Sequence, residues 1–224
     1  MNSHHKWKHF NKKTPVSVPL DKLFYEKVSH DLNILDAGCG WGRIALQLQR
    51  EGYNVTGFDI NPKNIASANE FAQKSNSIYE NKIDFTVANA LNLPYEDESF
   101  DVYLMQAFMT TIVDVDDRLS ILMEAQRILK TGGILYIADF GQTWDPVYKK
   151  RYLSDYKVTG EMCTFIVREN GNPDGVEIYR AHHYSEKELK NLLRPLFRID
   201  LIEKRVFTSY HGNKVNGFIV IASK

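Results

Sequence analysis

Short apolar runs alternate with helical periodicity over residues 20–139 of the chain. The runs are bounded by turn residues, as is typical of buried strands, and between them apolar residues recur at every third or fourth position, as in amphipathic helices. Strands that alternate with helices predict an α/β fold in which a parallel sheet carries helices on both faces. We predict strands at about 33–37, 54–58, 83–88, 102–106 and 134–139, and helices at about 20–29, 42–51, 61–72 and 116–129.

The pattern changes after residue 139. Apolar stretches at 163–167 and 176–179 flank a segment rich in glycine and asparagine, which predicts a β-hairpin with a long tip. Ser185 and Glu188 have the S-x-x-E spacing of a capping box and predict the start of a helix. Two late strands, at about 199–207 and 215–222, are joined by a turn at 211–213, so we expect the last pair of strands to be antiparallel.

The chain begins with a polar, basic segment that contains Trp7 and Phe10. These two aromatic residues lie one helical turn apart, so residues 1–13 could fold over a pocket. The alternatives are a solvated tail and, because of the paired histidines His4 and His5, a remnant of an expression tag. We predict an N-terminal lid segment and helix over 1–30, one domain over 31–224, and a substrate-side insertion over 140–184 within that domain.

The composition argues against several functional classes. Among 224 residues, 28 lysines and arginines balance 28 aspartates and glutamates, so no overall field attracts nucleic acid or an anionic membrane. The two cysteines, Cys39 and Cys163, lack disulfide-framework or metal-ligand spacing, and we expect no metal. No apolar run has membrane-spanning length and no signal-peptide core is present, so we expect a cytoplasmic protein. The oligomeric state stays open.

A glycine-rich turn follows the first predicted strand. Gly38, Gly40 and Gly42 stand at alternate positions before the next helix, where they allow backbone with positive φ and close approach of a ligand. Asp59 ends the second strand, at the edge of the sheet where such folds bind ligands. It is placed either to accept hydrogen bonds from both hydroxyls of a ribose or to help cap the following helix. The turn therefore predicts a nucleotide-like ligand.

Arg43 helps to distinguish two kinds of ligand. A nicotinamide dinucleotide would also suit the glycines and an aspartate about twenty residues later. However, a dinucleotide turn takes glycine or alanine at its sixth position, and here that position is Arg43. The arginine disfavours the pyrophosphate arrangement without excluding it.

Motifs further along the chain favour another cofactor. The segments 35–42 (LDAGCGWG), 57–59 (GFD), 89–95 (NALNLPY) with 99–101 (SFD), and 129–133 (LKTGG) resemble, in this order, the class I S-adenosylmethionine-dependent methyltransferases. The resemblance covers about 34–139. It implies a Rossmann-like seven-stranded sheet of order 3-2-1-4-5-7-6 with strand 7 antiparallel, an inserted β-hairpin lid, and S-adenosyl-L-methionine as cofactor, with S-adenosyl-L-homocysteine as its product.

The resemblance also implies a set of cofactor contacts. The glycines would bring backbone against the methionine part, and Asp59 would hold the ribose. Ile60 would lie against the adenine. Asn89 stands where members of this family often have an aspartate, and its amide oxygen would accept a hydrogen bond from the amino group of the adenine. The full set of implied contacts is Asp36, Gly38, Gly40, Gly42, Arg43, Asp59, Ile60, Asn89, Ala90 and Gln106.

The remaining four contacts concern the amino group and carboxylate of the methionine part and the adenine ring. Asp36 would orient the glycine loop or reach the amino group through water, and the carbonyl of Gln106 would accept from the same amino group. Arg43 could approach the carboxylate, although an exposed arginine at the start of a helix is an equal alternative. The backbone N–H of Ala90 could meet a ring nitrogen of the adenine.

The methyl acceptor is less well defined. Methyl transfer from a sulfonium is an in-line displacement that needs alignment more than obligatory side chains. We predict that His182, His183 and Tyr184 act as a base or orient the acceptor, with ordinary strand-end histidines as the alternative. The predicted function is methyl transfer to a small-molecule acceptor. The alternatives are an RNA or protein methyltransferase, another use of the cofactor such as cyclisation, and a non-catalytic cofactor-binding accessory protein.

Overall fold

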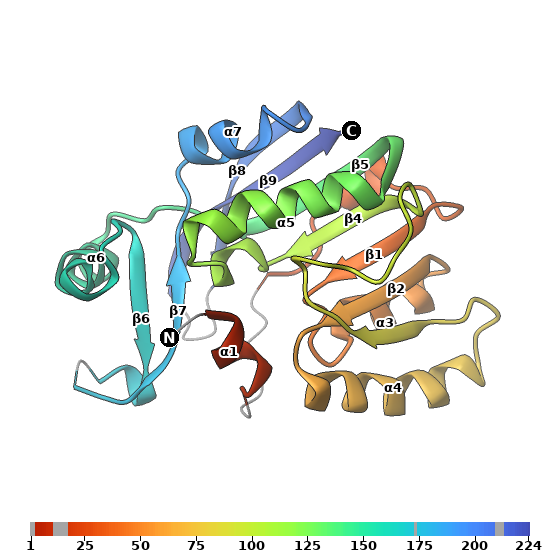
Figure 1. Cartoon of the computed structure of the whole chain (residues 1–224), viewed down its shortest axis with the longest axis horizontal. Coiled ribbons are helices and arrows are strands. Elements are labelled where there is room, and N and C mark those ends of the chain that lie inside the picture. The colour runs from red at the N-terminus through yellow and green to blue at the C-terminus, as the bar shows by residue number, and fades with distance from the viewer. Residues whose placement is uncertain (1–2, 11–17, 173, 209–212) are drawn as a thin grey trace.

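The fold is built on one seven-stranded sheet, seen in a computed structural model that describes residues 3–10, 18–172, 174–208 and 213–224. Its strand order is β3-β2-β1-β4-β5-β9-β8 (Figure 1). β1 to β5 run parallel, and β9 is antiparallel to both of its neighbours, β5 and β8. The strands are β1 (Asn33–Ala37), β2 (Asn54–Asp59), β3 (Asp84–Val87), β4 (Phe100–Gln106), β5 (Leu129–Phe140), β8 (Arg198–Thr208) and β9 (Lys214–Ser223).

This sheet confirms the predicted fold class. When the two strands of the inserted hairpin are left out of the count, the order is 3-2-1-4-5-7-6, with an antiparallel seventh strand. The predicted turn at 211–213 lies, apart from Asn213, outside the described residues.

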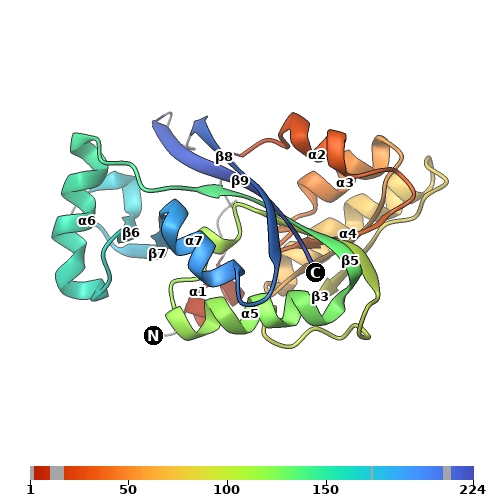
Figure 2. The ribbon, with the colours of Figure 1, turned by 90° about the horizontal axis from the view of Figure 1, so that it is seen from above.

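Helices cover both faces of the sheet. Helices α5 (Val115–Ile128) and α7 (Glu186–Leu193) lie on one face, and α2 (Lys22–Lys27), α3 (Arg43–Arg50) and α4 (Pro62–Asn76) lie on the other (Figure 2). Successive residues of a strand point to opposite faces, so Tyr103 and Met105 of β4 pack in the core under α5, and Val102 and Leu104 pack in the core under α3. The two cores hold the carboxyl ends of β1, β2 and β4 side by side.

Short polar signals set where two helices begin. The side chain of Asn61 accepts hydrogen bonds from the N–H groups of Lys63 and Asn64, and Pro62 occupies the first turn of α4. Ser185 and Glu188 form the predicted capping box at the start of α7.

The segment between β5 and α7 forms the predicted hairpin and, in addition, a helix that the sequence analysis did not predict. The hairpin strands β6 (Thr164–Arg168) and β7 (Glu177–His182) are antiparallel and are joined through the short helix η2 (Glu169–Gly171). The unpredicted helix is α6 (Pro146–Thr159), on which Val147, Leu153 and Val158 are exposed. Because exposed apolar residues break up the buried stripe, its pattern does not read as an amphipathic helix.

The insertion has a small core of its own. Tyr148 and Tyr152 of α6 pack against Phe165 of β6 and Ala181 of β7. In Figures 1 and 2 the insertion stands at one end of the sheet, beyond the carboxyl ends of the parallel strands. It therefore lies on the side where ligands bind in this architecture.

Candidate functional site

A cavity lies at the carboxyl ends of β1, β2 and β4. Its wall contains every predicted cofactor contact except Gly42. It also contains residues that the sequence analysis had not placed in the site. The lining residues are Trp7, Asp36, Gly38, Cys39, Gly40, Trp41, Arg43, Ile44, Phe58, Asp59, Ile60, Asn64, Ala88, Asn89, Ala90, Gln106, Ala107, Phe108, Thr111, Ile112 and Ile121.

The three glycines of the first turn have different roles. All three have positive φ, at 64°, 57° and 86° for Gly38, Gly40 and Gly42. A Cβ on Gly38 would come within 2.5 Å of Cδ2 of Phe108, and one on Gly42 within 2.6 Å of Cζ of Phe85. A Cβ on Gly40 would have no neighbour within 4 Å. Gly40 is thus open to the cavity, whereas Gly42 is the N-cap of α3 and packs against Phe85 rather than lining the cavity.

Asp59 closes the turn from the end of β2. Its Oδ2 accepts the N–H of Gly40 at 3.0 Å, and its Oδ1 accepts the N–H of Asn61 at 2.7 Å. The side chain of Asn64 also hydrogen-bonds to this carboxylate. Two carboxylate oxygens offer about four acceptor positions, so the group can still accept from a ligand. Burial raises the pKa of Asp59 above its ordinary value, although these hydrogen bonds oppose the rise. The carboxylate therefore supports the glycine loop and the start of α4 and also lines the cavity, and the predicted binding of a ribose stays a prediction.

Three buried polar atoms at the cavity have no hydrogen-bond partner among the described residues. They are Oδ2 of Asp36, Nε of Arg43 and Oε1 of Gln106. Arg43 and Gln106 are tied to the segment before α2, because Nη2 of Arg43 donates to the carbonyl of Val18 at 3.3 Å and Nε2 of Gln106 to the same carbonyl at 3.0 Å. Buried polar atoms without partners are costly, so these three indicate a ligand that supplies partners.

The pKa of Asp36 is shifted strongly by its surroundings. Its side chain is buried at the end of β1, and burial raises its pKa to about 7, although Arg43 opposes the rise. A cationic group in the cavity would favour the ionised carboxylate.

The turn after β3 supplies the remaining predicted contacts. Asn89 uses its Oδ1 to accept the N–H of Leu91 at 3.1 Å, and Ala88 donates its N–H to the carbonyl of Asp59 at 3.1 Å. Asn89, Ala90 and Ile60 all line the cavity. The polypeptide thus brings together the ends of β1, β2 and β3 as the resemblance implied.

The lining residues that include Asp36, Gly40 and Asp59 are called the polar half of the cavity below. A second group, called the apolar half, is mostly apolar and was for the most part not predicted. It is formed by the turn after β4 and by α5, with Phe108, Thr111, Ile112 and Ile121 in the wall. Ala107 begins this turn with φ of 52°, uncommon for a residue with a Cβ, and its N–H donates to the carbonyl of Ala138 at 2.8 Å. The only signal in the sequence was a loop rich in Met, Thr and Phe at the end of a predicted strand.

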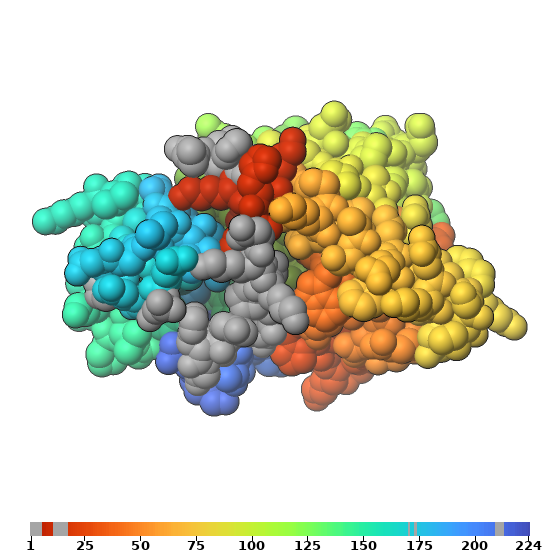
Figure 3. Space-filling model, turned by 90° about the horizontal axis from the view of Figure 1, so that it is seen from below, coloured from red at the N-terminus to blue at the C-terminus, as the bar shows by residue number. Residues whose placement is uncertain are grey.

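Helix α1 (Ser3–Lys8) closes one side of the cavity. Trp7 lines the cavity, and its ring packs on Tyr179 of β7 with centroids 4.9 Å apart. Lys6 forms an ion pair with Glu177 of the same strand. Nδ2 of Asn61 donates to the carbonyl of Phe10 at 2.7 Å. In Figure 3 the atoms of α1 (red) lie between the hairpin (blue) and the start of α4 (orange).

The three predicted catalytic residues are buried and are not among the residues that line the cavity. Nδ1 of His183 lies 2.7 Å from the hydroxyl of Tyr152, and the hydroxyl of Tyr184 donates to the carbonyl of Met109 at 3.0 Å. Burial lowers the pKa of His183 to about 3, so this imidazole is neutral at physiological pH. His182 lies between two carboxylates. The structure thus places the three outside the lining of the cavity, with His182 and Tyr184 hydrogen-bonded to the 109–111 turn.

Comparison with known proteins shows the family of the chain. A family described as a methyltransferase domain matches residues 35–137. A ubiquinone biosynthesis O-methyltransferase from Rickettsia typhi is 33% identical over 87% of this chain and 78% of that protein. The O-methyltransferase resE from Aspergillus sclerotiorum is 34% identical over 62% of this chain and 54% of that protein. A crystal structure of a SAM-dependent methyltransferase from Methanosarcina mazei has a TM-score of 0.86 and 39% identity, covering 92% of this chain and 99% of that one.

The chain therefore belongs to the class I S-adenosylmethionine-dependent methyltransferases. The cofactor of this family is S-adenosylmethionine. It spans about half the length of most curated relatives compared, with 54% of the resE protein and 38% to 46% of five others. Among the helices that the structure describes, none has both the length and the apolar character needed to cross a membrane.

Proposed function

We propose that this chain binds S-adenosylmethionine in the cavity and transfers its methyl group to a small molecule that carries an acidic hydroxyl group. The observation that supports this most strongly is that one cavity is lined by two groups of residues of different polarity. Asp36, Gly40 and Asp59 belong to the polar half, whereas Phe108 and Ile112 belong to the apolar half. Several relatives are named O-methyltransferases, which supports oxygen as the accepting atom.

The polar half fits the cofactor. Asp59 would hold the ribose hydroxyls, and the open backbone at Gly40 would admit the methionine part. The unpartnered Oδ2 of Asp36 and Oε1 of Gln106 suit its ammonium group, and Nε of Arg43 suits its carboxylate. When bound, S-adenosylmethionine supplies a methyl group on a positively charged sulfur. The protein then has to align the acceptor and exclude water.

The apolar half constrains the acceptor. The described residues that line the cavity include no histidine, and their carboxylates, Asp36 and Asp59, lie in the polar half. An acceptor that ionises near neutral pH, such as a phenol with electron-withdrawing substituents or an enol, needs no base from the wall. Helix α1 covers the cavity through Trp7 and its contacts with Asn61 and the hairpin, which favours a small acceptor over a polymer.

A binding and product assay tests this function. The purified chain is screened for thermal stabilisation by S-adenosylmethionine, S-adenosylhomocysteine and NADH, and we expect the first two to stabilise it. It is then incubated with S-adenosylmethionine and separate panels of phenols, enols, carboxylates, amines, thiols, RNA and protein. Mass spectrometry should detect methylated phenol or enol. Stabilisation by NADH alone would refute the cofactor, and binding without any methylated product would favour an accessory role.

A further inference from the structure

One cluster of charged side chains is not used in this mechanism. It joins four elements, because Arg118 lies on α5, Glu161 follows α6, His182 ends β7 and Glu188 lies on α7. Arg118 and His182 are almost completely buried. Both terminal nitrogens of Arg118 bind Glu161, at 2.6 and 2.8 Å, and its Nη1 lies 3.5 Å from Glu188. The cluster therefore connects the insertion to the two helices that cover one face of the sheet.

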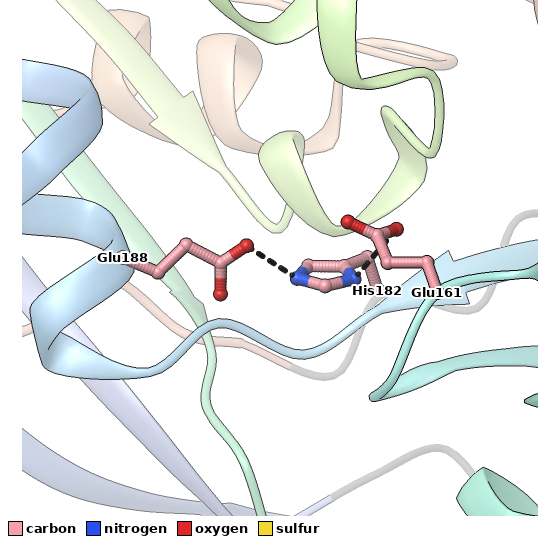
Figure 4. Close-up of side chains that lie close together, drawn as sticks. All are labelled: Glu161, His182 and Glu188. Atoms are coloured by element: carbon pink, nitrogen blue, oxygen red, sulfur yellow. Dashed lines mark hydrogen bonds and ion pairs between the residues drawn. The ribbon is translucent and has the colours of Figure 1, made fainter.

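The imidazole of His182 is held at both of its nitrogens. Nε2 lies 3.0 Å from Oε1 of Glu188, and Nδ1 lies 3.2 Å from Oε2 of Glu161, on the other side of the ring (Figure 4). The hydroxyl of Thr164 also lies 2.7 Å from Nδ1. Because the carboxylates approach opposite nitrogens, the three residues form a bridge rather than a set of ligands that converge on one point. A ring with an acceptor at each nitrogen is best satisfied when both nitrogens carry a proton.

Charge balance leads to the same protonation state. Two carboxylates and one guanidinium leave one uncompensated negative charge, which a protonated His182 neutralises. Burial lowers the pKa of His182, but its hydrogen bonds to Glu161 and Glu188 outweigh this and raise the pKa above its ordinary value. The ring of Tyr184 packs against the ring of His182, with centroids 4.6 Å apart, and the buried groups Asp139 and His183 interact with His182 electrostatically.

The cluster is connected to the apolar wall of the cavity. The carbonyl of His182 accepts the hydroxyl of Thr110 at 2.9 Å, and Nε of Arg118 donates to the carbonyl of Ile112 at 2.9 Å. Thr110 belongs to the short helix η1 (Met109–Thr111), and Thr111 and Ile112 line the cavity. The turn that forms the apolar half is therefore fixed by the same residues that fix the insertion.

We propose that His182, protonated and bridged between Glu161 and Glu188, is a positioning residue that locks the insertion onto the core and holds the 109–112 turn in place at the acceptor half of the cavity. It acts through this turn and not as a base. The assignment of this half to the acceptor rests on the proposed function, whereas the lock itself does not. Loss of the proton as pH rises leaves Arg118 as the only cation between the two carboxylates among the residues of this cluster, removes one of the two N–H donors of the ring, and loosens the turn.

The test uses the full chain and needs neither cofactor nor acceptor. The ¹⁵N shifts of the His182 ring are recorded from about pH 5.5 to about pH 9, together with amide hydrogen exchange of residues 109–112, corrected for the intrinsic pH dependence of exchange. We expect a doubly protonated ring at neutral pH. We expect protection of residues 109–112 against amide exchange to fall by about tenfold as the His182 ring titrates, because one charge-assisted hydrogen bond is lost. Protection of β1 should fall less.

Matched variants separate this role from general destabilisation. His182→Gln should remove the pH step, whereas His183→Gln, a change at the adjacent buried histidine, should keep it. If His182→Gln does not fold, Glu188→Gln still tests the lock, because removing one carboxylate should move the step to lower pH. A neutral His182 ring at pH 7, or a step that persists in His182→Gln or is unmoved in Glu188→Gln, would overturn the proposal.

A kinetic readout connects the lock to the acceptor. With any acceptor that gives product, KM for the acceptor should rise with the same midpoint as the exchange step in the wild type and not in His182→Gln. The Kd for S-adenosylhomocysteine should be the same in both proteins at each pH. Absence of product with every acceptor would count against the proposed function and leave the exchange and ¹⁵N results intact, so the two failures are distinguishable.

Discussion

Nδ2 of Asn61 donates a hydrogen bond to the carbonyl of Trp7 at 3.1 Å, which ties the N-terminal helix to the start of α4. The same amide donates to the carbonyl of Phe10, while its oxygen caps α4 and its backbone N–H binds Asp59. One residue thus connects the proposed ribose-binding carboxylate, through its backbone, to the helix beside the cavity, through its side chain. We therefore expect the contact between Asn61 and α1 to affect binding in the cavity.

Replacing Asn61 by serine should release α1 without removing the cap of α4. Serine is also a good N-cap but lacks the amide that binds the two carbonyls. We expect amide exchange of residues 3–10 to accelerate by about tenfold, since two hydrogen bonds are lost, and KM for the acceptor to rise. Lys8→Ala, at an exposed position of α1, is the control and should change neither quantity. Unchanged exchange in Asn61→Ser would exclude this role for the amide.

Asp59 should contribute to cofactor affinity through its charge and its two oxygens. Replacing it by alanine should weaken S-adenosylhomocysteine binding by about 1–3 kcal/mol, the range for hydrogen bonds to a charged group. Isothermal titration calorimetry measures the change. Asp84→Ala, at an exposed aspartate that begins β3, is the matched control. Equal affinities in wild type and Asp59→Ala would remove the carboxylate from the cofactor site.

The residues of the polar half could be predicted because the information that places them is local in sequence. Gly40 and Asn89 each follow a short apolar strand and Asp59 ends one, and the rule that parallel strands share a carboxyl edge brings them together. Local pattern fails where a residue's neighbours come from distant elements. Gly42 has the spacing of its fellow glycines, but its role depends on Phe85 from β3.

The predicted acceptor-site residues show the same limit more strongly. His182 and His183 are adjacent, yet one lies between carboxylates from α7 and the segment after α6, and the other pairs with Tyr152 of α6. Helix α6 was itself not predicted. The sequence pattern therefore could not show that α6 and α7 bury the two histidines from different sides. Histidines at the end of a predicted hairpin then look accessible when they are buried.

The ionised side chain of Asp36 should destabilise the free protein at high pH and should stabilise its complex with S-adenosylmethionine. Burial raises the folded-state pKa to about 7 from an ordinary value near 4, so its contribution is present at low pH and is lost as pH rises through about 7. Asp36→Asn should therefore raise the melting temperature of the free protein at pH 8, with a smaller gain at pH 5. The same variant should bind S-adenosylmethionine more weakly. A gain that is equal at both pH values would show that the carboxyl does not titrate in this range.

Replacing Gly38 by alanine should destabilise the protein more than replacing another glycine with a similar backbone conformation. Gly38 and Gly160 both have positive φ, at 64° and 72°, so alanine is strained at either position. A Cβ at Gly38 would also meet the ring of Phe108 at 2.5 Å, whereas a Cβ at Gly160 would have no neighbour within 4 Å. We expect Gly160→Ala to cost about 1 kcal/mol and Gly38→Ala about 1–3 kcal/mol more, measured by urea unfolding. Replacing Phe108 by leucine in the Gly38→Ala background should recover part of this difference, because the smaller side chain relieves the contact. If the two alanine variants were equally stable, the ring of Phe108 would not be what requires glycine at position 38.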